Sequence, residues 1–213
     1  MLTLKLVIFD LDGVLVDACE WHRVALNESL KEICGYEISL EDHYNVFNGL
    51  PTQVKLNKLT QGGIISEDMH NSIYHLKQQK TIDVVEQKAS IAVDKMELIK
   101  WLKAKDIKVA CFTNSIRETA HLMLKKTGVY DLLEMVVTNQ DVEKAKPDPE
   151  GYIKVLEHFN IDKTSTIIIE DSPKGLEAAY ASGCHVMRVK NPTDVNIEFF
   201  KEHMNENFNS NGR

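Results

Sequence analysis

The sequence predicts an α/β protein with a doubly wound parallel sheet, helices on both of its faces, and a helical segment inserted near the N-terminus. Short apolar runs that end in polar loops recur along the chain, which is the pattern of strands buried on both faces. Helical patterns alternate with these runs, as they do in parallel α/β sheets. Residues 17–91 interrupt the alternation with helical patterns and few strand signals.

Five apolar runs are the expected strands of the sheet. They comprise residues 4–9, 107–112, 134–137, 165–169 and 185–189. The first run ends at Asp10, the second at Thr113 and the fourth at Glu170. Ligands of open α/β sheets bind at the carboxyl ends of the strands, so we expect these residues at the binding edge.

Helices are expected between the strands. Their predicted apolar faces are Met96, Ile99 and Leu102, then Ala120, Met123 and Leu124, then Ile153, Leu156 and Phe159. Gly128 is placed to end the second of these helices. Asp148 and Pro149 are expected to begin the third, and Ser172 to cap a further helix that ends near Gly183.

The segment after the first strand is expected to form a separate helical unit. Trp21 and Ala25 carry one helical pattern, and Leu26, Leu30 and Ile33 carry the next. We therefore predict a catalytic core of residues 1–16 and 92–213, and a helical cap domain of residues 17–91.

The composition argues against nucleic acid and membranes as partners. The 213 residues include 25 Lys and Arg but 32 Asp and Glu, a net charge of −7, which repels anionic polymers and lipids. No stretch approaches the roughly 20 apolar residues that span a bilayer. The N-terminal apolar run is too short for a secretory signal, and the four cysteines lack metal-ligand spacing. We expect a cytoplasmic monomer.

Complementary polar groups converge on the predicted binding edge. Asp10 and Asp12 follow the first strand, Asp171 follows the fourth, and Lys146 precedes a helix. Several carboxylates crowd together in ionised form only beside a cation, and their hard oxygen atoms favour Mg²⁺, usually together with a substrate phosphate. A carboxylate can attack phosphorus, and a second one can serve as acid and base.

These residues resemble the motifs of the haloacid dehalogenase-like (HAD) hydrolases. Residues 10–17, DLDGVLVD, resemble the first motif, and Thr113, Lys146 and Glu170 with Asp171 stand in the order of the other three. The helical insert is similar to the cap of subfamily I, in the branch of β-phosphoglucomutases and sugar-phosphate phosphatases. The resemblance covers nearly the whole chain and implies a HAD-like Rossmannoid core.

The resemblance implies a role for each matching residue. Asp10 would be the nucleophile, and Asp12 would protonate the leaving oxygen and then activate water. Thr113 and the amide of Asn114 would hold the phosphoryl oxygens. Lys146 would neutralise charge on the nucleophile and the phosphate.

The same resemblance implies Mg²⁺ as the cofactor. Asp10 and the backbone carbonyl of Asp12 would bind the ion. Asp171 would be a further ligand, and Glu170 would bind the ion either directly or through another ligand.

Four residues of the insert are candidate substrate contacts, each with a plainer alternative. His22 resembles a cap histidine of the mutase-like branch, or is a half-exposed helix residue. Gly49 and Thr52 resemble the cap specificity loop, or belong to an ordinary turn. Lys80 reaches the far end of the substrate, or belongs to a solvated helix face. The remaining histidines of the insert are expected at the surface: His43, His70 and His75.

The leading functional prediction is a Mg²⁺-dependent phosphatase that acts on a small phosphorylated metabolite, most simply a sugar phosphate. The alternative is a β-phosphoglucomutase-type isomerase, which must grip a second phosphate, and arginine does this best. Arg23 is the one arginine in the predicted cap, which favours the phosphatase. A third reading is a catalytically silent binding protein on the same fold.

Overall fold

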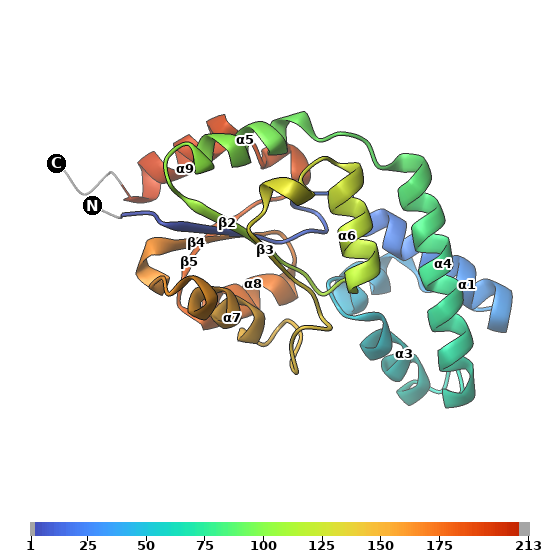
Figure 1. The fold of residues 1–213 in the computed structure, drawn as a ribbon. Coiled ribbons are helices and arrows are strands. Elements are labelled where there is room, and N and C mark those ends of the chain that lie inside the picture. Colours follow the sequence, from blue (N-terminus) through green and yellow to red (C-terminus); the bar gives the residue numbers. More distant parts are fainter. Residues whose placement is uncertain (1–2, 209–213) are drawn as a thin grey trace.

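The computed structural model describes residues 3–208 as a parallel sheet with helices on both faces and a helical insert at one end (Figure 1). The strands are β1 (Leu6–Phe9), β2 (Lys108–Phe112), β3 (Met135–Val137), β4 (Thr166–Glu170) and β5 (His185–Arg188). All strand pairs are parallel, in the order β3-β2-β1-β4-β5. The predicted fold class is therefore confirmed.

The two faces of the sheet are covered by different helices. The helices of the sheet are α5 (Val93–Lys103), α6 (Arg117–Lys126), α7 (Glu150–Phe159), α8 (Pro173–Ser182) and α9 (Ile197–Phe208). Alternate residues of β1 enter opposite cores, because successive strand side chains point to opposite faces. Val7 and Phe9 pack with α5, α6 and α9, whereas Leu6 and Ile8 pack with α7 and α8. Figure 1 shows α5 and α9 above the sheet and α7 and α8 below it.

Several predicted helix ends agree with the structure, but one apolar face does not. The Ser172 side chain accepts a hydrogen bond from the Gly175 amide at the start of α8, and Gly183 ends that helix with a φ of 77°. In α7 the buried residues include Tyr152 and Val155, while Ile153 is 40% exposed. The predicted face was therefore wrong at Ile153, because the helix packs on the sheet through Tyr152 and Val155. The helix also begins one residue later than the Asp148 and Pro149 signal suggested.

Helices between β1 and α5 form the insert. They are α1 (Cys19–Cys34), α2 (Leu40–Asp42), η1 (His43–Phe47), α3 (Thr52–Gln61), η2 (Glu67–Met69) and α4 (His70–Lys88). The insert has an apolar cluster of its own, which includes Leu26, Leu30 and Leu56. It lies beside the carboxyl ends of the strands (Figure 1). Within residues 3–208, no helix is long and apolar enough to cross a membrane.

Strand order places the site. The chain runs from β1 outward to β2 and β3 and then returns to β4 on the other side of β1. The sheet therefore changes direction at β1, and a crevice forms at such a switch point in open α/β sheets. Asp10, Thr113 and Asp171 directly follow the three adjacent strands β1, β2 and β4.

Candidate active site

A cavity of about 280 Å³ lies between the switch point of the sheet and the insert. Asp10, Asp12, Thr113, Asn114 and Lys146 line it from the sheet. The insert contributes His22, His43, Gly49, Thr52, Lys55, Lys77 and Gln78 to its lining. Most predicted site residues of the sheet, of α1 and of the segment around the start of α3 are thus brought together around one space. Glu170 and Asp171 do not line it but lie beside Asp10.

Lys146 joins two carboxylates beneath this cavity. Its Nζ donates hydrogen bonds to Asp10 Oδ1 at 2.5 Å, to Glu170 Oε1 at 2.6 Å and to the Phe112 carbonyl at 2.9 Å. The side chain of Lys146 is 3% exposed and that of Glu170 is fully buried. Although burial lowers the pKa of Lys146, Asp10 and Glu170 outweigh it and raise the pKa well above its usual value. The lysine therefore remains a cation.

Glu170 uses both carboxylate oxygens within the protein. Oε1 accepts hydrogen bonds from Lys146 and from the Tyr152 hydroxyl, the latter at 3.0 Å. Oε2 accepts from the amides of Asp171 and Ser172 and from the Ser172 hydroxyl. A carboxylate that accepts five hydrogen bonds has little capacity left for a metal ion. This arrangement therefore favours the prediction that Glu170 acts on the ion through another ligand and not by direct binding.

Asp10, Glu170 and Asp171 each place one carboxylate oxygen within 4.8 Å of the others. Asp171 Oδ1 is buried and has no hydrogen-bond partner among residues 3–208. Burial and the nearby Glu170 raise the pKa of Asp10 well above its usual value and the pKa of Asp171 to about 7. An orphaned oxygen among crowded acids is what a hard cation would satisfy. The residues present therefore fit Mg²⁺, with Asp10 and Asp171 as its side-chain ligands.

Asp12 is held in its ionised form by donors from both sides of the cavity. His22 Nε2 donates to Oδ1 at 2.9 Å, while Ser115 Oγ and Thr113 Oγ1 donate to Oδ2 at 2.8 and 3.3 Å. Burial raises the pKa of Asp12, but the charge and hydrogen bond of His22 and the hydrogen bond of Ser115 outweigh it. They lower that pKa to about 2.

A second lysine fixes the protonation state of His22. Lys77 Nζ lies 3.1 Å from His22 Nδ1, and an ammonium group only donates. His22 Nδ1 therefore accepts, and the proton resides on Nε2, which donates to Asp12. Burial and Lys77 lower the pKa of His22 although Asp12 opposes them, so the imidazole is neutral.

The insert is linked to the sheet through Asn114. Its Nδ2 donates to the Gly49 carbonyl at 2.8 Å and to the Lys146 carbonyl at 3.1 Å, and its Oδ1 accepts from the Lys146 amide. Gly49 adopts a φ of +76°, and a Cβ there would lie 3.2 Å from Ser172 Oγ. The loop before α3 therefore lies close against the motif residues of the sheet.

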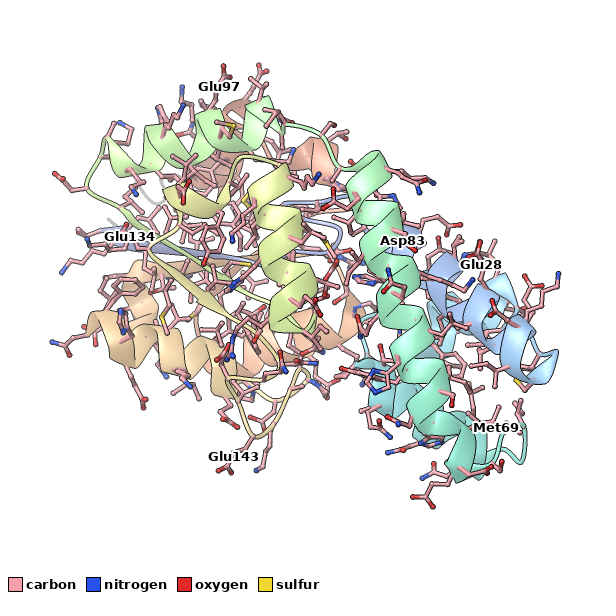
Figure 2. The ribbon with its side chains drawn as sticks, turned by 45° about the vertical axis from the view of Figure 1, so that its right-hand side comes forward. Glu28, Met69, Asp83, Glu97, Glu134 and Glu143 are labelled. Carbon is pink, nitrogen blue, oxygen red and sulfur yellow. The ribbon has the colours of Figure 1, made fainter. Side chains whose placement is uncertain are left out.

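Lys80 is placed away from the cavity. Its Nζ lies 3.1 Å from Glu32 and 3.7 Å from Glu28, and it does not line the cavity. The helices α1 and α4 lie side by side (Figure 2), and these ion pairs join them. This arrangement matches the plainer alternative of a helix-face lysine.

Sequence reasoning missed several residues of the site. Nothing in the sequence pattern marks Ser115 and Tyr152 as site residues, and only their contacts in the structure, with Asp12 and Glu170, reveal them. The sequence did contain a signal for Lys77, because it lies at four-residue spacing between Ile73 and Thr81 on the buried face of α4. The surface prediction was also wrong for two histidines: His43 is 2% exposed and His70 is 8% exposed. His70 is buried because its ring nitrogens contact Gln53 and Thr60.

A family model described as haloacid dehalogenase-like hydrolase matches residues 7–189. The chain belongs to this family. The family match, together with relatives that are named as phosphatases, confirms the prediction of a HAD-like enzyme of the phosphatase type.

Two curated relatives of this HAD-like chain are named as phosphatases. The phosphorylated carbohydrates phosphatase of Thermotoga maritima is 27% identical over 84% of this chain and 82% of its own length. The phosphoglycolate phosphatase of Nitrosospira multiformis is 30% identical over 88% of this chain and 84% of its own length.

Solved structures share the fold. β-Phosphoglucomutase of Clostridium difficile superposes with a TM-score of 0.81 at 20% identity, over 95% of this chain and 98% of its own. CbbY of Rhodobacter sphaeroides, solved with xylulose-(1,5)bisphosphate, gives a TM-score of 0.77 at 17% identity, over 87% of this chain and 85% of its own.

Proposed function

We propose that this HAD-like hydrolase is a Mg²⁺-dependent phosphatase of a small phosphorylated metabolite, of the sugar-phosphate type, acting through an aspartyl phosphate. The observation that carries the proposal is the position of Asp10. It lies at the switch point, paired with Lys146 at 2.5 Å, and faces a cavity that the insert helps to line. A phosphoryl group in that cavity would meet a carboxylate nucleophile backed by a buried cation.

In the first half of the reaction, an Asp10 oxygen forms a bond to phosphorus and the ester bond to the leaving oxygen breaks. Thr113 and the amide of Asn114 hold the phosphoryl oxygens, while Lys146 limits repulsion between the nucleophile and the phosphate. Asp12 gives its proton to the leaving oxygen, which departs as an alcohol. Mg²⁺, when held by Asp10, Asp171 and the Asp12 carbonyl, supplies further positive charge to the transferring group.

In the second half, Asp12 takes a proton from water, and the hydroxide attacks phosphorus to release phosphate and regenerate Asp10. The ionised Asp12 of this structure is suited to that step. The first step needs a protonated Asp12, which loss of the His22 hydrogen bond favours because burial alone raises its pKa. We propose that residues 17–91 act as a cap whose movement makes and breaks this contact and excludes bulk water.

The test measures phosphate release with Mg²⁺ across a panel of phosphorylated metabolites, for the natural chain and for Asp10→Asn. We expect one compound class to release phosphate and the nearly isosteric variant to release none while melting at a similar temperature. Activity that survives in Asp10→Asn would remove the covalent mechanism. A biological role that survives the same change would favour the silent binding protein.

The mutase alternative is favoured by one observation, the presence of Lys55 and Lys77 in the cavity lining. These cations could substitute for the arginine that is absent from that lining. β-Glucose 1-phosphate with a trace of bisphosphate primer separates the two functions. Glucose 6-phosphate formed without free phosphate indicates a mutase, and free phosphate indicates a phosphatase.

A further inference from the structure

Two lysines of the insert are buried against the same cavity as the nucleophile. Lys55 of α3 is 7% exposed and Lys77 of α4 is 6% exposed, and both line the cavity. Lysine is almost never buried to this degree without a partner. Burial lowers the pKa of Lys55 to about 8 and that of Lys77 to about 7. The pKa values fall because nearby negative charge does not offset the cost of burying the ammonium groups.

Their partners within the protein are few. Lys77 donates one hydrogen bond, to the neutral His22. Among residues 3–208, the ammonium group of Lys55 has neither a hydrogen bond nor an ion pair. Lys80, by contrast, is paired with two exposed glutamates of α1. The buried lysines are thus the incomplete ones.

Charge is unevenly distributed around the cavity. On the sheet side, Asp10, Glu170 and Asp171 outnumber Lys146, which is the excess of negative charge that a metal ion offsets. On the insert side, Lys55 and Lys77 face a single carboxylate, Asp12. One positive charge there remains unbalanced, and an unpaired buried charge is costly.

We propose that Lys55 and Lys77 form a second anion subsite on the insert side of the cavity, which binds a carboxylate or a second phosphate of the substrate. The favoured substrates are then phosphorylated acids or bisphosphates, and not monophosphates of neutral sugars. This inference rests on the proposed function, because the transferred phosphoryl group occupies the sheet side. Gln78, whose buried Oε1 also lacks a hydrogen-bond partner among residues 3–208, accepts a hydrogen bond from a substrate hydroxyl between the two anionic groups.

The preference is measured with compounds that differ in the second anion. The pairs are 2-phosphoglycolate against 2-hydroxyethyl phosphate, and fructose 1,6-bisphosphate against fructose 1-phosphate. We expect kcat/KM to be at least tenfold higher, in one pair, for the member that carries the second anionic group. The first pair reports a carboxylate ligand and the second a phosphate ligand. Equal or higher kcat/KM values for the members without a second anionic group, in both pairs, overturn the proposal.

Variants of Lys55 test whether this lysine causes the preference for a second anionic group. Lys55→Met is expected to reduce the ratio of the two kcat/KM values at least tenfold, and Lys55→Arg to restore most of it. Lys58→Met is the matched control, because Lys58 lies one turn further along α3 and is exposed. A ratio that is unchanged in a folded Lys55→Met overturns the proposal, with folding checked by thermal melting.

A binding experiment separates this proposal from the proposed function. Calorimetric titration of the Asp10→Asn protein with the same pairs needs neither turnover nor a folded Lys55→Met. Tighter binding of a compound that carries the second anionic group supports the subsite even when no compound releases phosphate. Equal binding within both pairs overturns the subsite, while phosphate release from monophosphates without a second anionic group would still uphold the phosphatase.

Discussion

The ammonium group of Lys146 lies 2.6 Å from the Glu170 carboxylate, and both side chains are almost completely buried. The same nitrogen lies 2.5 Å from Asp10. One cation therefore balances two carboxylates that come from separate strands, and this link connects the third sequence motif to the first and the fourth.

Lys146→Met is expected to destabilise the fold as well as to abolish phosphate release. It leaves Asp10 and Glu170 buried without their shared cation, a loss of about 3–5 kcal/mol in the free energy of unfolding. Urea unfolding measures it. Lys144→Met is the control, because Lys144 is exposed two residues earlier, and its effect should stay within about 0.5 kcal/mol. Equal unfolding midpoints for the two variants would contradict the assignment.

His22→Ala is expected to reduce stability by about 1 kcal/mol at pH 8 through the lost hydrogen bond to Asp12. Because the pKa of His22 is lowered in the folded state, the unfolded state binds a proton below about pH 6.5 that the folded state does not bind. This difference lowers the stability of the natural chain as the pH falls. The lowered pKa of Asp12 adds stability that is lost as the pH falls from about 4 toward 2.

The stability difference between the natural chain and His22→Ala should therefore shrink as the pH falls below 6.5, and shrink further below about pH 4. Urea unfolding at pH 8, 5 and 3.5 in the presence of a chelator measures it. A difference that stays constant over this range would show that neither group is perturbed as the structure indicates.

Mg²⁺ is expected to raise the melting temperature, and more strongly at pH 8 than at pH 6. Burial and Glu170 raise the pKa of Asp171 to about 7, so below that pH a proton competes with the metal ion. The apparent affinity should fall roughly tenfold per pH unit for one displaced proton. Asp171→Asn should lose this thermal response. Full phosphate release in excess chelator would defeat the metal assignment.

The fold could be predicted because its signals are local. Each strand is a short apolar run, and the residues that end β1, β2 and β4 need no tertiary information to be noticed. The Asp10 and Lys146 pair was predicted because the motif order places both at one edge of the sheet, and the structure brings them to 2.5 Å. The roles given to these residues remain predictions.

The insert side of the site could be predicted only in part. Lys55 and Lys77 face the cavity because α3 and α4 pack against α1 and the sheet at particular rotations, and no single helix sequence specifies that docking. Lys80 was the predicted cation, three residues from Lys77 on the same helix, and it pairs with Glu28 and Glu32 further along α1 instead. A shift of one turn thus separates a cavity residue from a surface ion pair.

Gly13→Ala is expected to damage the metal site, because Gly13 leaves room for Asp171. Its φ is +94°, and a Cβ at this position would lie 2.2 Å from Asp171 Oδ2. Two effects therefore follow from one methyl group. The backbone strain of a side chain at positive φ costs about 1–2 kcal/mol, and the Asp171 carboxylate must move away from Asp10.

Gly35→Ala separates these effects. Gly35 also has a positive φ, +70°, but a Cβ there would meet nothing within 4 Å. Both variants should lose about 1–2 kcal/mol of stability from strain, while Gly13→Ala alone should weaken Mg²⁺ binding and phosphate release. Urea unfolding and the Mg²⁺-induced thermal shift measure the two effects separately. Equal Mg²⁺ responses in both variants would mean that Asp171 does not hold the ion, because a displaced ligand cannot leave metal affinity unchanged.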